Sequence, residues 1–147
     1  MVEKIRLYHG TLMDVARPVQ QGEIDLFGVV DKEDPALSGN LTDSRRIAQN
    51  FAVFAPGFQE GRSTFAVMIF EIPSNLVINH GPIACFNEAD SFSTTEIVPS
   101  EQVPGDYLRR LSETKPRAVD ELRTAKLLCF RVRSEYLMSV EELGEEV

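Results

Sequence analysis

With 147 residues, 43% of them apolar and 26% charged, the chain has the size and composition of one soluble globular domain with a substantial core. Its formal net charge of −8 argues against bulk electrostatic binding of nucleic acid, because that binding needs a basic face. No stretch reaches the roughly 20 apolar residues that span a bilayer, and the N-terminus lacks the pattern of a signal peptide. We therefore expect a single domain over residues 1–147 with no membrane partner. It is expected to act in the cytoplasm in which it is made or in a cytoplasm to which it is delivered as an effector.

The N-terminal segment predicts a strand followed by a short helix. Residues 4–9 (KIRLYH) alternate loosely and reach a breaker at Gly10, so we expect a strand that ends there. Thr11 can cap the helix. The apolar face of this helix contains Leu12, Val15, Ala16 and Val19. Turn formers and acids over residues 29–40 then predict a surface loop.

The clearest amphipathic helix lies in the segment LTDSRRIAQNFAVFA, residues 41–55. Thr42, Asp43 or Ser44 can cap it. Its apolar residues recur at helical spacing at Ile47, Ala48, Phe51, Ala52 and Ala55. Residues 63–73 (STFAVMIFEIP) follow, and their branched and aromatic residues predict a strand buried on both faces.

The second half of the chain predicts short elements in irregular order. These are a strand over 76–78, a turn at His80, Gly81 and Pro82, a strand over 94–99 broken by Pro99, a helix after Gly105, another over 117–125 and a strand over 126–134. The acidic segment EELGEEV, residues 141–147, is predicted to be a solvated tail. About five strands and three to four helices that do not alternate favour an α+β fold.

Common catalytic motifs are absent from the sequence. There is no GxGxxG, no Walker loop, no HExxH and no GxSxG. Cys85 and Cys129 stand in apolar contexts and are predicted to be buried free thiols. Two cysteines and two dispersed histidines make a poor zinc set, so no metal is expected.

Three segments fit together as one pattern. They are LYHGT, then GNLTDSRRIAQNFA, then STTEIVP. This order resembles the ADP-ribosyltransferase fold, in particular the His-Tyr-Glu branch shared by diphtheria-type toxins and poly(ADP-ribose) polymerases. The resemblance covers roughly residues 5–108. It implies a split antiparallel β core with a few short helices, NAD as the substrate, and no metal.

The resemblance also implies roles for individual residues. NAD cleavage passes through an oxocarbenium-like state that a carboxylate can stabilise. Glu96 and His9 would be the catalytic pair; Glu96 would bind the nicotinamide ribose and His9 the adenosine ribose. Gly10 would leave room for the nicotinamide amide. The other residues expected to contact NAD are Tyr8, Thr11, Leu41, Thr42, Ser44 and Phe51.

The sequence departs from the family pattern at one position and leaves readings open at others. The family's stacking tyrosine falls near Leu41, and Phe51 either supplies the stack or belongs to the core. Ser44 fits a contact to nicotinamide and a helix cap equally well. Thr94 stands where arginine-modifying branches carry Glu or Gln, which argues against arginine as the acceptor.

The expected function is therefore NAD-dependent mono-ADP-ribosyl transfer to a macromolecular acceptor, a protein rather than a nucleic acid. NAD glycohydrolysis, with water as the acceptor, is one alternative. A second alternative is an inactive module of the same fold that binds NAD, ADP-ribose or a protein, and an unrelated α+β domain is a third. An inhibitory or antitoxin protein partner is left open.

Overall fold

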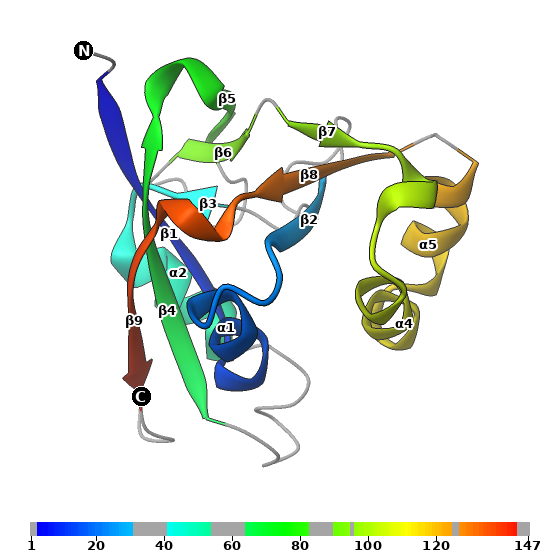
Figure 1. The fold of residues 1–147 in the computed structure, drawn as a ribbon, viewed down its shortest axis with the longest axis horizontal. Helices are drawn as coiled ribbons and strands as arrows, with labels where there is room; N and C mark the ends of the chain where they lie inside the picture. Colours follow the sequence, from blue (N-terminus) through cyan, green and yellow to red (C-terminus); the bar gives the residue numbers. More distant parts are fainter. Residues whose placement is uncertain are drawn as a thin grey trace.

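The computed structural model describes residues 3–30, 41–53, 64–82, 90–94, 96–124 and 127–143. These residues form two antiparallel sheets and four α-helices, which confirms the α+β class (Figure 1). The larger sheet consists of β1 (Lys4–Leu12), β3 (Leu41–Thr42), β4 (Phe65–Pro73), β5 (Val77–Pro82), β6 (Asp90–Thr94) and β9 (Leu137–Leu143). Its strand order is β5-β6-β3-β1-β4-β9, so β1 lies near its centre.

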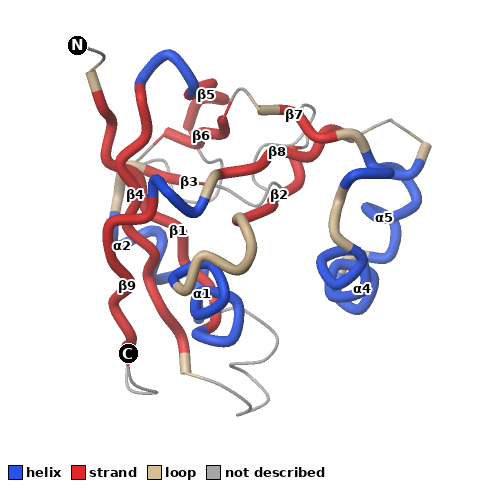
Figure 2. The backbone as a smooth tube through the Cα atoms, in the orientation of Figure 1, coloured by secondary structure: helices blue, strands red, loops and turns tan. Residues whose placement is uncertain are grey.

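The smaller sheet has the order β2-β8-β7. Its strands are β2 (Leu26–Val30), β7 (Ile97–Val98) and β8 (Leu128–Val132). The helices are α1 (Met13–Gln20), α2 (Arg45–Val53), α4 (Gly105–Thr114) and α5 (Pro116–Arg123). Figure 2 shows α4 and α5 together, on the far side of the smaller sheet from the larger one. No helix in the described part of the chain has the length and apolar character needed to cross a bilayer.

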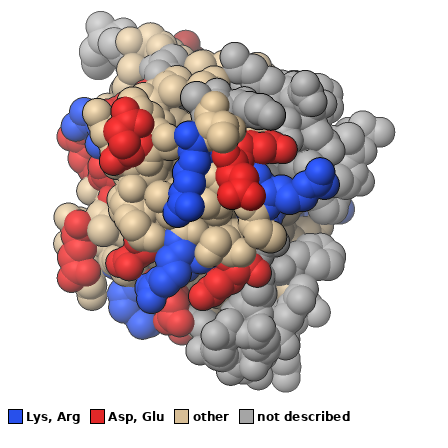
Figure 3. All heavy atoms as spheres, turned by 90° about the vertical axis from the view of Figure 1, so that its right-hand side faces the viewer, with Lys and Arg blue, Asp and Glu red and all other residues tan. Residues whose placement is uncertain are grey.

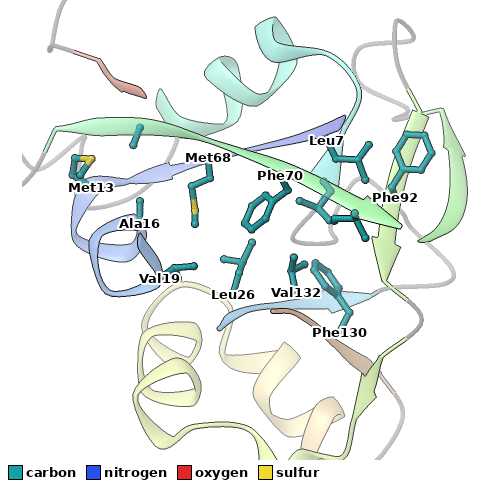
Figure 4. Packing of buried hydrophobic residues seen from close by; sticks show 13 residues of the cluster. Leu7, Met13, Ala16, Val19, Leu26, Met68, Phe70, Phe92, Phe130 and Val132 are labelled. Carbon is teal, nitrogen blue, oxygen red and sulfur yellow. The ribbon is translucent and has the colours of Figure 1, made fainter. Parts of the chain in front are cut away.

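The main core fills the space between the two sheets and α1 (Figure 4). Leu7 of β1 and Phe70 of β4 are cross-strand partners and are both fully buried. The smaller sheet contributes Phe130 and Val132, and α1 contributes Val19. As predicted, β4 is buried on both faces, because the main core and α1 cover one face, α2 packs against the other, and apolar residues lie along its length.

A second apolar cluster covers the other face of the smaller sheet. Its buried members are Val98, Val103, Leu122 and Cys129, and Phe27, Tyr107 and Leu108 pack against them. The helices α4 and α5 supply part of this cluster, which explains their position beside the smaller sheet (Figure 1). Cys129 is a buried free thiol, as predicted, whereas Cys85 lies outside the described residues.

The first strand is longer than the sequence predicts. β1 continues through Gly10 and Thr11 to Leu12, because its pairing with β4 extends to the Leu12–Phe65 pair. Thr11 therefore does not cap α1, which begins at Met13 without a side-chain cap. Tertiary pairing overrides the local preference of glycine for a strand end here.

Two strands include residues that the sequence predicted as loop or tail. Val29 belongs to β2 rather than to a loop, and Glu141 and Glu142 belong to β9 rather than to a solvated tail. Both segments become strands by pairing with distant partners, β2 with β8 and β9 with β4. Most of the predicted loop and the last residues of the tail, 31–40 and 144–147, lie outside the described residues.

The structure also differs from the predictions for two segments in the middle of the chain. His80, Gly81 and Pro82 belong to β5, not to a turn, and the register shifts between Asn79 and Gly81 where β5 pairs with β6. The strand predicted over 94–99 contains β7 of the smaller sheet and only the last residue of β6, Thr94; the rest of β6, in the larger sheet, was not predicted. This segment therefore carries the chain from one sheet to the other.

Candidate functional site

His9 lies on the face of β1 that looks toward the smaller sheet. Alternate residues of a strand share a face, so His9 lies on the same face as Leu7, which belongs to the core between the sheets. Its cross-strand partner on β4 is Met68, which is fully buried. His9 itself is half-buried. Thr11 has the same orientation and is 9% exposed.

Gly10 and Tyr8 face the opposite way, toward α2. A Cβ placed on Gly10 would overlap the carbonyl oxygen of Ala48 and lie 2.9 Å from the backbone nitrogen of Ala52. The backbone of α2 thus occupies the space beside Gly10, which the sequence analysis assigned to the nicotinamide amide. Phe51 lies one turn beyond Ala48 on the same helix and is half-buried.

Leu41 lies beside His9 in the sheet. Tyr8 pairs with Thr42, so the adjacent residues His9 and Leu41 both project from the other face. Leu41 is fully buried, and its partner on β6 is Phe92. At the position of the family's stacking tyrosine, the chain therefore places a core side chain.

Ser44 caps α2, and Thr42 supports the turn before it. The Ser44 Oγ accepts a hydrogen bond from the Ile47 backbone N–H at 3.3 Å, and the Thr42 Oγ1 accepts one from the Ser44 N–H at 3.2 Å. Ser44 therefore has the position and the bond of an N-cap, which was one of the two readings of the sequence. Thr42 is 1% exposed, so its hydroxyl lies inside the protein.

Glu96 lies just before β7 and is held by Arg131 of β8 and by Arg133, which follows the end of that strand. Its carbonyl oxygen accepts a hydrogen bond from the Arg131 N–H at 3.1 Å. Its carboxylate accepts a bond from the Arg131 Nη2 and two more from Arg133, at 3.3 Å from Nε and 3.4 Å from Nη2. The Glu96 side chain is 32% exposed. The candidate catalytic carboxylate therefore already has partners.

Asp25 completes this charged cluster. Its Oδ2 lies 3.8 Å from the Arg131 Nε, and its Oδ1 accepts a hydrogen bond from the Ser134 N–H at 2.8 Å. The sequence analysis did not single out Asp25, Arg131 or Arg133. The sequence did contain a signal for the two arginines: they alternate with apolar residues in FRVRS, residues 130–134, which places both on one face of a strand.

His9 and Glu96 approach the smaller sheet from different sides. Arg131 pairs with Phe27, which packs in the cluster on the outer face of that sheet, together with Cys129. The carboxylate of Glu96, which Arg131 holds, therefore lies on this outer face. His9 looks toward the inner face, where Phe130 and Val132 pack.

The backbones of His9 and Glu96 are nevertheless directed to the same end of the larger sheet. Tyr8 pairs with Thr42, and Thr42 pairs with Ser91, so β1 and β6 run in the same direction with Tyr8 level with Ser91. β6 ends at Thr94, and Glu96 follows two residues later. The side chain of Thr94 lies outside the described part of the chain.

The other titratable groups near the smaller sheet offer no nucleophile. Burial raises the pKa of the Cys129 thiol to about 12, so almost none of it is the reactive thiolate at neutral pH. Burial also raises the pKa of Tyr107. Among the described residues, no group of three His, Cys, Asp or Glu side chains could hold a metal ion.

The charge on the face shown in Figure 3 is mixed. Lysine and arginine side chains alternate with aspartate and glutamate over the described part of this face, without a continuous basic surface.

Comparisons with protein families, curated proteins and solved structures found no match for this chain. Two groups remain for a functional proposal: the half-buried imidazole of His9 in β1, and the Glu96 carboxylate held by two guanidinium groups beside the smaller sheet.

Proposed function

We propose that the protein is an NAD-dependent mono-ADP-ribosyltransferase with an ADP-ribosyltransferase-like fold. The observation that supports this proposal most is the register through β3. It sets His9 level with Phe92 on β6, and β6 leads into Glu96 at the end of the sheet toward which β1 also runs. The antiparallel core divided between two sheets agrees with this assignment, whereas α2 fills the space beside Gly10, so Gly10 has no role in binding nicotinamide here.

In this proposal the chain binds NAD near the end of β1. His9 donates a hydrogen bond to a ribose hydroxyl. Phe51 belongs to α2, which packs against the opposite face of β1, so it takes no part in this site. The Glu96 carboxylate accepts a hydrogen bond from the nicotinamide ribose and stabilises the positive charge that develops as the bond to nicotinamide breaks. The ADP-ribose then passes to a nucleophile on a protein acceptor.

A second candidate is a module of the same fold that binds NAD, ADP-ribose or a protein without turnover. Two observations favour it. Arg131 and Arg133 already occupy the Glu96 carboxylate, and Leu41 is fully buried where the family's pattern has a stacking tyrosine. Two nearby guanidinium groups also oppose the negative potential that an oxocarbenium-like state needs.

Nicotinamide release from NAD separates these functions. We expect the wild-type protein to release nicotinamide with a cell lysate present, and Glu96→Gln to lower the rate by about 10²- to 10³-fold, the usual effect of losing one electrostatic contact to a transition state. Glu71→Gln is the matched control, because Glu71 is also a partly exposed partner of an arginine, Arg6. Its rate should equal that of the wild type.

The other outcomes identify the alternatives. Release that does not need an acceptor indicates NAD glycohydrolysis. NAD binding in calorimetry without release, by wild type and Glu96→Gln alike, supports the binding module and contradicts the transferase. Absence of NAD binding contradicts both the transferase and an NAD-binding module.

A further inference from the structure

The contacts of Glu96 leave its carboxylate little capacity for a ligand. An ionised carboxylate has about four acceptor positions on its two oxygens. In Glu96, Oε1 accepts from Arg131 and Arg133, and Oε2 accepts from Arg133. Three of these positions are therefore already used, and the carboxylate is directed to the outer face of the smaller sheet, away from the face toward which His9 looks.

The local charge is also unsuitable for catalysis in this arrangement. Asp25 and Glu96 carry two negative charges, and Arg131 and Arg133 carry two positive charges. Such a neutral cluster presents little net field to a developing cation, because opposite charges within a few ångströms largely cancel at longer range. Charge stabilisation by Glu96 requires that at least one guanidinium group moves away.

We propose that Arg131 and Arg133 form a latch that holds Glu96 in a resting position, and that NAD turnover requires its release. This inference rests on the proposed transferase function. It describes the regulation of the same site: the protein is slow while the latch is closed and faster once the Glu96 carboxylate is free of the guanidinium groups.

Asp25 makes the release possible at small cost. The Arg131 Nε already lies 3.8 Å from the Asp25 Oδ2, and the Ser134 N–H fixes the other oxygen of Asp25. When Glu96 leaves, Arg131 keeps a carboxylate partner within reach. Arg133 is 51% exposed, so water can solvate its guanidinium group in the open state. The latch thus has two states, and each provides a partner for Arg131.

The first test removes the exposed half of the latch. Arg133→Gln should raise the rate of nicotinamide release about two- to fivefold, because an exposed ion pair shifts an equilibrium by no more than about that factor. Arg6→Gln is the matched control, since Arg6 is 54% exposed and pairs with a glutamate in the other sheet. Its rate should not change. Adding Glu96→Gln to Arg133→Gln should remove the gain.

The second test uses Asp25 and has the opposite sign. Asp25→Asn keeps an oxygen for the Ser134 N–H but removes the negative charge that attracts Arg131 in the open state, so nicotinamide release should slow by a similar factor.

The dependence of the release rate on salt concentration is a third test. Release by the wild type should rise between low and high ionic strength, whereas Arg133→Gln should respond less, because its exposed pair is already absent.

The possible results separate the latch from the enzyme. If the wild type releases nicotinamide and Arg133→Gln is equal or slower, the latch is contradicted and the transferase proposal stands. If neither the wild type, Arg133→Gln nor Arg133→Lys releases nicotinamide, both proposals are contradicted. Arg133→Lys, which keeps the charge but loses the two-nitrogen contact, gives an intermediate rate under the latch and replaces Arg133→Gln if that variant does not fold.

Discussion

Gly10 of β1 lies directly against Ala48 of α2, so closely that a Cβ on Gly10 would overlap the Ala48 carbonyl oxygen. Backbone packs against backbone at this point, and neither side has a flexible side chain that could move away. The contact fixes α2 on the larger sheet, on the face opposite to the main core. It also explains why glycine continues the strand here without ending it.

Gly10→Ala should therefore destabilise the protein strongly. Overpacking a core usually costs about 1–3 kcal/mol, and we expect at least the upper end because the obstacle is backbone. Urea unfolding followed by circular dichroism measures the loss. Gly105→Ala, at the start of α4, is the control, since a Cβ there meets nothing within 4 Å. Equal unfolding midpoints for the two variants would contradict the packing at Gly10.

Ser44 should act as a helix cap. Ser44→Ala removes the oxygen that accepts from the Ile47 N–H, and the free energy of unfolding should fall by about 0.5–2 kcal/mol. Ser44→Asp keeps an acceptor and should retain most of the stability. NAD affinity, measured by calorimetry, should be unchanged in both variants. A stable Ser44→Ala protein with weakened NAD binding would show instead that this serine contacts the ligand.

Cys129 should be unreactive in the folded protein. Burial raises the pKa of its thiol from 9.0 to about 12, so alkylation by iodoacetamide at pH 8 should occur only after unfolding. A Cys85→Ser background isolates this thiol. Because the folded-state pKa lies above the unfolded one, the associated stability is present below pH 9 and is lost as pH rises toward 12. Rapid native-state alkylation at pH 8 would contradict the burial.

Arg45 of α2 and Glu141 of β9 connect two elements that are far apart in sequence. The Arg45 Nε lies 2.9 Å from the Glu141 Oε2, and this hydrogen bond raises the pKa of Arg45. Both side chains are about 40% exposed, so a double-mutant cycle should give a coupling of only about 0.2–1 kcal/mol. The coupling should shrink at high salt. A coupling that persists in 1 M salt would point to a role beyond the ion pair.

Local patterns were sufficient to predict some elements and insufficient for others. The helical spacing of Ile47, Ala48 and Ala52 predicted α2, and the apolar run around Phe70 predicted the doubly buried β4. β2 and β9 have weak patterns of their own, and their strand conformation comes from pairing with β8 and β4. No local rule contains that information, because the partners lie far away in the chain.

The sequence likewise predicted some features of the candidate site and not others. The order of the three motifs singled out His9 and Glu96, and the register of the larger sheet directs their backbones to one end. The sequence could not show that Glu96 would face Arg131, because this depends on the crossing of the chain between the sheets. Nor could it show that the backbone of α2 would fill the space beside Gly10, since strand alternation alone does not place a helix.

Two of the crossings between the sheets are short, and both sheets share one core. The chain passes from β6 to β7 through residues 95–96 and from β8 to β9 through residues 133–136. The main core holds the sheets together more firmly than these links do, because Leu7 and Phe70 of the larger sheet pack in it with Phe130 and Val132 of the smaller one. The sheets should therefore respond to mechanical force as one body. Any change at Glu96 is then a side-chain rotation, which is fast compared with turnover and produces no lag before steady state.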